Sequence, residues 1–423
     1  MSVYLKQLLR PMSLLFSNTA WLFGAEILAK LSRVVTIIVL AFMLSPVSYG
    51  TAMLALACHE LFSLFLKAGA GPQIIRCSDT QLSRYVQNGT IIQWGICLLM
   101  LSVQLIGAGI VANWYNNPDI AQLLYVMSLT YLLYPWVSVR VFLMQRANNM
   151  RGFGIRHGLC VSAENLSIAL FAWYKADIMA VAYGKLVFSV LWLVLFIKVP
   201  TPRFLWQWHW PTLKLLLSRS GQIFSSELLK SLRLHLDTFI AAKVMSPELF
   251  GYYSFAKNAG IGLSQSIGNV FNAALYPFLC KLQRVGTLTN HLLMVYVIAI
   301  AVAIIFVVQA CAVPIYLPLL FDEKWQEMTF VVSVMCLVAV PALLLDTRCC
   351  LSRAQAQFTA EIVVRLICLL ISVILLVTLS PQQPLAFAYV MLLSSCVCCF
   401  VVFCAPVVNK TILRFKRGVR HEY

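Results

Sequence analysis

The sequence predicts an all-α polytopic membrane protein with twelve transmembrane helices in two repeated six-helix bundles. Composition, the placement of basic loops and an internal repeat lead to this prediction. The chain is 61% hydrophobic and 11% charged, whereas soluble proteins contain roughly 25% charged residues. Lipid leaves no partners for open backbone groups, so spanning segments must be helices or a closed barrel. Apolar runs of roughly 20 residues indicate helices.

The twelve apolar segments follow one another with short connections. The first carries charges and is too long for the apolar core of a signal peptide, so we expect it to be retained. Several segments exceed 25 residues and are expected to tilt or protrude. In chain order, their expected limits are 17–43, 47–71, 90–112, 121–145, 154–174, 177–197, 219–245, 249–277, 290–317, 328–347, 356–379 and 384–407.

The basic residues between these segments predict the orientation. The formal net charge is +17. Twenty Lys and Arg residues fall in the ends and loops of one side, and only Lys175 and Lys324 fall on the other. Basic loops face the cytoplasm, so both termini are expected inside. The basic excess is therefore topological, with anionic lipid headgroups as its neighbours, and it argues against a nucleic-acid partner.

Two stretches of the chain look like copies of one another. Residues 24–50 read GAEILAKLSRVVTIIVLAFMLSPVSYG, and residues 225–251 read SSELLKSLRLHLDTFIAAKVMSPELFG. Glu26 aligns with Glu227, and Gly50 aligns with Gly251. Each copy precedes a long apolar segment that ends near a proline, Pro72 or Pro277. A duplicated helix with charges in its middle is what a two-halved transporter with a polar cavity requires.

The repeat predicts four parts. Residues 1–197 form an N-terminal six-helix bundle and residues 219–407 a C-terminal one, and 408–423 form a basic cytoplasmic tail. The connection 198–218 contains Trp206, Trp208 and Trp210 with basic residues, which is typical of an amphipathic helix on the headgroups.

Charges inside the predicted spans mark the candidate site. A charge at the bilayer centre costs about 2.5–3.5 kcal/mol on insertion scales, so these side chains should face the bundle interior or a wet cavity. Helical spacing places the charges of span 1 on one face of that helix and the charges of span 7 on one face of theirs. Charges on spans 2, 5 and 8 could complete a cavity between these faces. The candidate substrate-binding cations are Lys30, Arg33, Lys230, Arg233 and Lys257. The candidate coupling or orienting acids are Glu26, Glu60, Glu164, Glu227 and Asp237.

A cavity lined by both halves would carry net positive charge, because ten cations accompany seven acids within the spans. Such a cavity concentrates anions, and the arginine fork matches phosphate oxygens. The alternative for each charge is a structural ion pair inside the bundle, such as Glu26 with Lys30. Lys67, Lys243 and Asp346 are the ones most able to extend toward an interface.

Neither a metal nor another cofactor is expected. The fourteen cysteines lack zinc spacing and are typical of small apolar residues that pack helices. No glycine-rich phosphate loop ending in Lys-Ser or Lys-Thr occurs.

The segment 206–284 resembles the polysaccharide-unit flippases of the multidrug/oligosaccharidyl-lipid/polysaccharide exporter superfamily, in its O-antigen and exopolysaccharide branch. The resemblance lies in Asp237 near the end of span 7, the turn Gly251-Tyr252-Tyr253, and Pro277. Leu31-Ser32-Arg33 and the run from Leu143 to Arg146 are similar too, whereas Met245-Ser246-Pro247 departs from the glycine-containing turn of many relatives.

The resemblance implies two six-helix bundles in a V shape, as in multidrug exporters, and alternating access in the bacterial inner membrane. It implies an undecaprenyl-pyrophosphate-linked glycan as substrate, with a polysaccharide polymerase and chain-length machinery as partners, and no enzymatic activity. Two alternatives stay open: a cation-coupled drug or metabolite antiporter of the same superfamily, and a membrane polysaccharide polymerase. The outer loops, about ten residues at most, disfavour the polymerase. A peptidoglycan-precursor flippase is a further cousin, but such proteins commonly have two more spans.

Overall fold

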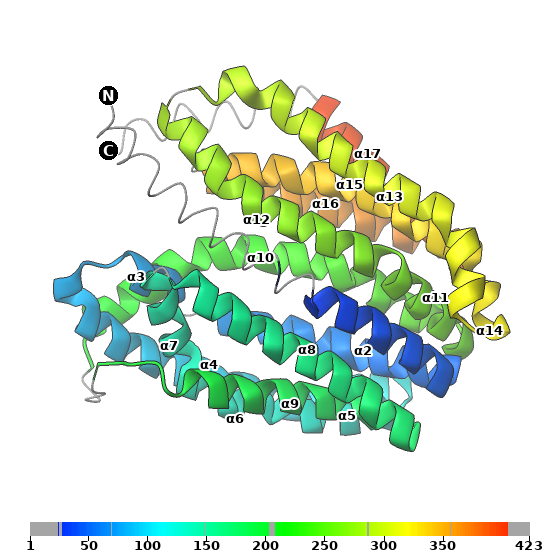
Figure 1. Cartoon of the computed structure of the whole chain (residues 1–423), viewed down its shortest axis with the longest axis horizontal. Coiled ribbons are helices and arrows are strands. Elements are labelled where there is room, and N and C mark those ends of the chain that lie inside the picture. The colour runs from blue at the N-terminus through cyan, green and yellow to red at the C-terminus, as the bar shows by residue number, and fades with distance from the viewer. Residues whose placement is uncertain are drawn as a thin grey trace. The chain divides into compact units, whose positions relative to one another are not determined.

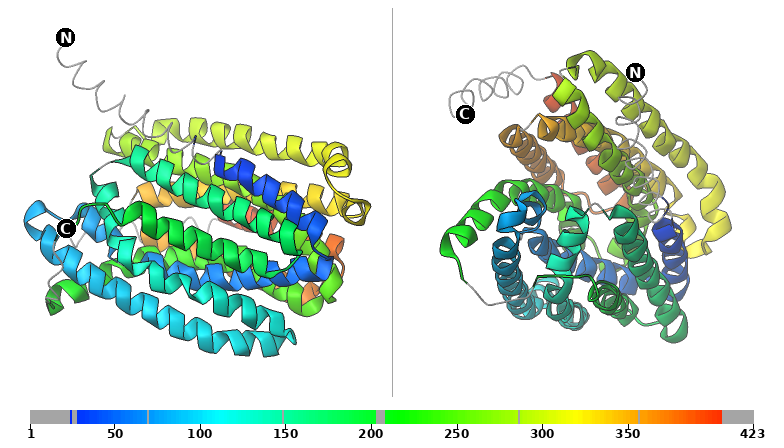
Figure 2. Two further views of the ribbon diagram at one scale, coloured as in Figure 1. Left: turned by 60° about the horizontal axis from the view of Figure 1, so that its bottom comes forward. Right: turned by 60° about the vertical axis from the view of Figure 1, so that its left-hand side comes forward.

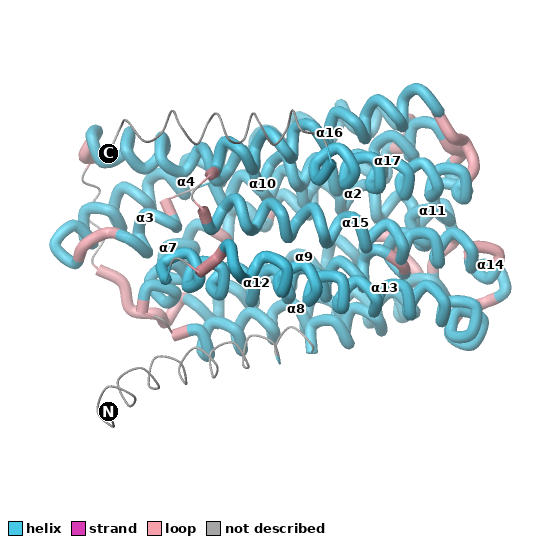
Figure 3. The backbone as a smooth tube through the Cα atoms, turned by 90° about the horizontal axis from the view of Figure 1, so that it is seen from above, coloured by secondary structure: helices cyan, strands magenta, loops and turns pink. Residues whose placement is uncertain are grey.

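The computed structural model describes residue 24 and residues 28–68, 70–147, 149–202, 208–285, 287–355 and 357–404. Within these ranges the chain is helical and contains no strand (Figure 3). Helical residues stand in each of the twelve predicted segments. Among the described residues, seven helices are long and apolar enough to cross a membrane, or eight if one bent pair counts as one span.

The chain divides into two compact units, Met1–Met43 with Ala55–Phe224, and Leu44–Leu54 with Ser225–Tyr423. The division differs from the predicted halves at residues 44–54, which group with the second unit, and falls inside helix α10 (Trp210–Val244).

The first unit contains helical residues 28–43 and a series of further helices (Figure 1). α8 packs along α9, and α4 packs along α5, which can be followed in the two views of Figure 2. In chain order, the elements are the end of α2 (Pro46–Ser63), η1 (Leu64–Ala68), α3 (Gly71–Arg76), α4 (Asp79–Tyr115), α5 (Pro118–Ser128), α6 (Thr130–Leu133), α7 (Pro135–Arg146), α8 (Met150–Lys175), α9 (Met179–Phe196) and the start of α10.

Local sequence explains where these helices begin and bend. The Asn117 side chain accepts a hydrogen bond from the Asp119 amide and Pro118 follows it, so α5 starts with a side-chain cap and a proline in its first turn. The Asn149 side chain caps α8 in the same way. Pro135 lies where α5–α6 and α7 meet at 57°, because proline lacks the amide that would continue the hydrogen-bond ladder.

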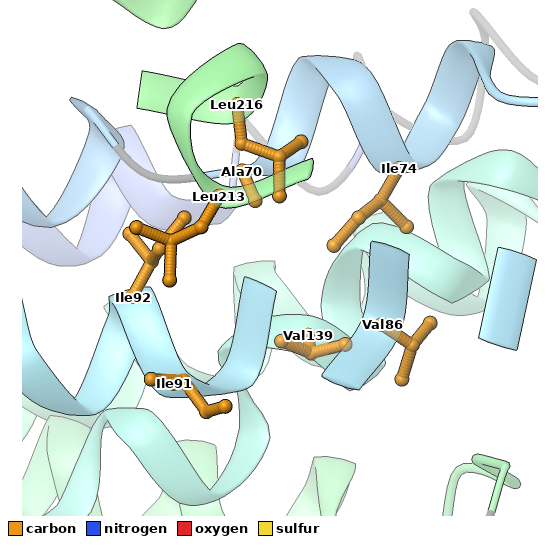
Figure 4. Packing of buried hydrophobic residues seen from close by; sticks show 8 residues of the cluster. All are labelled: Ala70, Ile74, Val86, Ile91, Ile92, Val139, Leu213 and Leu216. Atoms are coloured by element: carbon orange, nitrogen blue, oxygen red, sulfur yellow. The ribbon is translucent and has the colours of Figure 1, made fainter. Parts of the chain in front are cut away.

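The predicted connection 198–218 is structured differently from the expectation. Residues 203–207, which include Trp206, lie outside the described ranges, and from Trp210 onward the chain is the first part of α10. Leu213 and Leu216 are buried against Ala70, Ile74, Val86, Ile91, Ile92 and Val139 (Figure 4). The two leucines are three residues apart and share one helix face, and this face packs into the core of the first unit. Trp208 and Trp210 stay exposed.

The second unit is arranged around one central helix, α15 (Thr329–Ala354), which packs against α11, α12, α13, α16 and α17 (Figure 1). Ser246 caps α11, and Gly260 separates α11 from α12. The other elements are the rest of α10, α11 (Pro247–Ala259), α12 (Ile261–Val285), η2 (Thr289–His291), α13 (Leu292–Leu320), α14 (Glu323–Gln326), α16 (Phe358–Leu379) and α17 (Pro384–Cys404).

The two repeats meet inside the second unit at their matched glycines. A side-chain carbon on Gly50 would lie 3.0 Å from the Gly251 Cα, and one on Gly251 would overlap the Pro46 carbonyl. The Asn258 amide donates to the Tyr49 hydroxyl at 3.2 Å beside this crossing. Gly50 and Gly251 are therefore aligned in sequence and also in contact.

Candidate functional site

One face of α10 carries the polar side chains of the second repeat. Lys230, Arg233 and Asp237 line a cavity of about 980 Å³, open space at its mouth included. Glu227 and Lys230 line an adjoining cavity of about 670 Å³. The structure thus brings together the four charged residues that helical spacing assigns to one face.

The larger cavity is built from α10, α11, α12, α13, α15, α16 and α17 of the second unit. Its wall is largely apolar, with a minority of charged and amide side chains, which is the usual make-up of a ligand site. The polar and charged members are Lys230, Arg233, Asp237, Lys257, Ser264, Gln265, Asn269, Asn272, Asp346, Arg365 and Ser395.

An unbroken series of ion pairs joins α10, α15 and α16. Lys230 pairs with Asp346 at 3.3 Å, and Asp346 pairs with Arg365 at 3.3 Å. Arg365 contacts Glu361 at 3.1 Å, Glu361 contacts Arg353 at 2.7 Å, and Arg353 contacts Glu227 at 2.8 Å. Ser226 donates to Glu361 at 2.6 Å. Three cations alternate with three carboxylates, so the series is neutral.

Asp346, whose position in the sequence allowed it to extend toward an interface, belongs to this ion-pair series. It bridges Lys230 and Arg365. A carboxylate in apolar surroundings is stabilised by opposite charges and hydrogen bonds. Both requirements are met inside the bundle.

Lys257 belongs to a second cluster of charged and polar groups. Its ammonium lies 2.8 Å from the Asp237 carboxylate, 2.7 Å from the Thr238 hydroxyl and 2.9 Å from the Leu234 carbonyl. The Tyr253 hydroxyl donates to the other Asp237 oxygen at 2.6 Å. An ammonium has three donors, so Lys257 is fully engaged here and joins α11 to α10.

This cluster predicts strong coupling between Lys257 and Asp237. Lys257→Met leaves the Asp237 carboxylate, 1% exposed, without its cation, and we expect a loss of about 3–5 kcal/mol in the free energy of unfolding. Adding Asp237→Asn should recover much of that loss, since no buried charge then lacks a partner. Thermal unfolding of both single variants and the double variant measures the coupling, and additive effects would contradict it.

Arg233 differs from the other cations of the cavity. Its guanidinium reaches the Ser395 hydroxyl at 3.5 Å, and it forms no ion pair in the part of the chain that the structure describes. Five cations and four carboxylates line the two cavities. The excess positive charge therefore corresponds to the Arg233 guanidinium.

The first unit also combines paired charges with an arginine that forms no ion pair within the described ranges. Lys185 binds Glu164 at 2.7 Å and lies 3.7 Å from Glu60, so the two predicted acids surround one lysine. Arg33, in contrast, has neither a hydrogen bond nor an ion pair within the described ranges. Lys30 has a partner, whereas Glu26 lies outside the described residues.

The sequence interpretation missed several charged residues of this site. Arg353 lies between the predicted spans 328–347 and 356–379 and is one of the twenty cations assigned to ends and loops, yet it pairs with Glu227 and Glu361. Glu361 and Arg365 lie within the predicted span 356–379 but are not among the predicted site residues. Their spacing of four residues within an apolar helix was the available signal.

The described residues contain no group of three or more His, Cys, Asp or Glu side chains that could hold a metal ion. Within the described residues, the site consists of alternating basic and acidic side chains together with Arg233, which forms no ion pair.

Comparison with known proteins agrees with this architecture. A family described as "Polysaccharide biosynthesis protein" matches residues 39–330. The chain belongs to this polysaccharide biosynthesis family. It is a multi-pass membrane protein, and the two solved structures described below are a flippase and a transporter.

One curated relative is the lipopolysaccharide biosynthesis protein WzxC of Escherichia coli (strain K12), 22% identical over 266 residues. The match covers 59% of this chain and 52% of the relative, so the chain spans about half the length of that protein.

Two solved transporters show the fold of this family member. The lipid II flippase MurJ, in an inward closed conformation, superposes with a TM-score of 0.69 at 14% identity, covering 92% of this chain and 87% of MurJ. An inward-facing multidrug resistance MATE family transporter superposes with a TM-score of 0.67 at 11% identity, covering 93% and 96%. At these identities the likeness concerns the fold alone.

Proposed function

We propose that this protein is a flippase that moves undecaprenyl-pyrophosphate-linked oligosaccharide repeat units across the bacterial inner membrane, for O-antigen or exopolysaccharide synthesis. The family match and the relation to WzxC support the class of process. The proposal includes twelve spans with both termini in the cytoplasm and alternating access between two bundles. Membrane lipids surround it, and a polymerase with its chain-length machinery receives the product.

The observation that carries the proposal is the pair of unmatched arginines at the repeat. Arg33 and Arg233 come from corresponding helices, and neither forms an ion pair within the described ranges. Retaining an unneutralised cation in a span is costly, and a transported diphosphate would supply the missing negative charge. A cation-exporting antiporter would instead be expected to have an acidic cavity.

The remaining charges have supporting roles in this proposal. Lys230, at one end of the ion-pair series, contacts the diphosphate. Lys257 holds α11 against α10 next to the diphosphate until the cavity changes conformation. Glu227 and Asp237 in one unit, and Glu60 and Glu164 in the other, orient cations or take part in ion coupling. Glu26 is assigned the same role on sequence grounds.

Replacement of either arginine tests the function. Arg33→Ala and Arg233→Ala should each lower the flipping rate about ten- to hundred-fold, the effect of losing a charged hydrogen bond. Arg233→Lys should retain part of the activity, since it keeps the charge but loses the fork. Lys175→Ala, which removes an exposed charge at the end of α8, is the matched control.

The measurement is mass spectrometry of lipid-linked glycans from a deletion strain complemented by each variant, with leaflet assignment by an impermeant glycan-cleaving reagent. Accumulation of complete single units on the cytoplasmic side identifies a flipping defect. Periplasmic single units that stay unpolymerised would identify a polymerase instead. An unchanged pool in the deletion strain would overturn the proposal in favour of an antiporter.

A further inference from the structure

α12 presents a row of amide side chains to the cavity. Gln265, Asn269 and Asn272 line the larger cavity, and the two asparagines also line the adjoining one. Their spacing of four and three residues places them on one face of the helix. The amides thus form a polar strip beside the basic residues of α10.

These amides make no hydrogen bond with the protein. None of the three side chains has a partner within the described ranges. The Asn272 Oδ1 atom is buried and unsatisfied. Buried polar atoms nearly always have a partner in folded proteins, so the lack of one at Asn272 calls for a ligand or water at that place. Gln265 is half-buried and Asn269 is exposed, so the three amides together offer the cavity donors and acceptors that the described part of the protein does not use.

Neutral amides suit a particular ligand chemistry. Each carboxamide offers two N–H donors and one carbonyl acceptor within a few ångströms, which matches the adjacent hydroxyl groups of a sugar ring, because each hydroxyl both donates and accepts. A diphosphate, which only accepts, uses the donors alone and is better bound by Arg233 or Lys230. The apolar wall, including Leu234, Ile261 and Leu343, suits the C–H face of a sugar ring.

We propose that Gln265, Asn269 and Asn272 form the saccharide subsite of this cavity, separate from the diphosphate contacts on α10. This inference rests on the proposed flippase function and assigns the sugar portion of its substrate to α12. Lys230 lines both cavities together with Asn269 and Asn272, so the two subsites adjoin each other. Selectivity among glycans would then depend on α12.

The test separates sugar binding from diphosphate binding. The full chain and its variants are examined by native mass spectrometry with two probes: undecaprenyl pyrophosphate, and the lipid-linked saccharides extracted from the strain that lacks this gene. We expect the wild-type chain to bind the saccharide-bearing lipid more tightly. Asn269→Leu and Asn272→Leu should each weaken binding of that lipid about three- to ten-fold, the effect of losing a neutral hydrogen bond, and leave undecaprenyl pyrophosphate binding unchanged.

Two controls sharpen the result. Gln283→Leu removes an exposed amide from the same helix beyond the cavity lining and should bind both probes like the wild type. Arg233→Ala should weaken both probes together. Retained undecaprenyl pyrophosphate binding also shows that the asparagine variants are folded.

Other outcomes overturn the inference in distinguishable ways. Asparagine variants that bind both probes like the wild type would refute the saccharide subsite and leave the flippase function standing. Equal loss of both probes in those variants, with Gln283→Leu unaffected, would make the amides structural. A wild-type chain that binds neither probe would refute the flippase function itself.

Discussion

Glu361→Leu is expected to destabilise the protein by about 3–5 kcal/mol, the cost of removing one partner from a buried ion pair. The Glu361 side chain is 1% exposed and touches two guanidinium groups and one hydroxyl. Its loss leaves Arg353 and Arg365 with less compensating charge. Arg353 is 28% exposed and keeps Glu227, which favours the lower part of the range. The ten tryptophans of the chain allow thermal unfolding to be followed by fluorescence.

Glu227→Ala is the matched control for this prediction. Glu227 belongs to the same ion-pair series, but its side chain is 37% exposed and pairs with Arg353 alone. We expect a cost of about 1 kcal/mol or less, because water and salt screen exposed pairs. Adding Arg365→Met to Glu361→Leu should recover part of the loss by removing an unpaired charge. Equal midpoints for Glu361→Leu and Glu227→Ala would contradict a stabilising role for the buried series.

Gly251→Ala is expected to disrupt the crossing of the two repeats. The new methyl group would overlap the carbonyl of Pro46, and a backbone carbonyl cannot rotate aside as a flexible side chain can. Overpacking typically costs about 1–3 kcal/mol, and we expect at least that here. Detergent-solubilised protein should unfold at a lower temperature and lose the Tyr49–Asn258 contact beside the crossing.

Gly95→Ala provides the control, because a methyl group at Gly95 would have no neighbour within 4 Å. It also lies inside a helix, where alanine is favoured over glycine by roughly 0.5–1 kcal/mol, so its stability should be unchanged or raised. Gly50→Ala meets the Phe250 ring at 2.9 Å as well as backbone of Gly251, and an intermediate effect is expected. A Gly251→Ala chain as stable as Gly95→Ala would show that the crossing is loosely packed.

The sequence repeat predicted a duplicated architecture, but it did not predict which of its residues would be in contact. Alignment of Gly50 with Gly251 and of Glu26 with Glu227 predicted a duplicated architecture, and the structure places the two glycines against each other. The contact itself could not be predicted, since a glycine at a helix start is equally consistent with a turn. Close approach of two backbones is a property of the folded chain.

In the candidate site, too, the sequence predicted part of the arrangement and the folded chain decided the rest. Spacing along one helix predicted that Glu227, Lys230, Arg233 and Asp237 share a face, and all of them line the cavities. Spacing did not reveal that Arg353 would pair with Glu227 and Asp346 with Lys230, because these partners are separated by up to 126 residues in the chain. Nor did it identify the amides of α12, whose significance lies in the hydrogen bonds they lack.

By itself the sequence determined that this chain is a helical membrane protein with repeated charged helices, because apolar run length and helical period are local properties that lipid enforces strictly. Tertiary structure alone decided which charges cancel. Coulomb attraction falls with distance in space rather than in sequence. The packing of α10 against α15 and α16 therefore decides that, within the described residues, Arg233 has no carboxylate partner while Lys230 and Glu227 are paired.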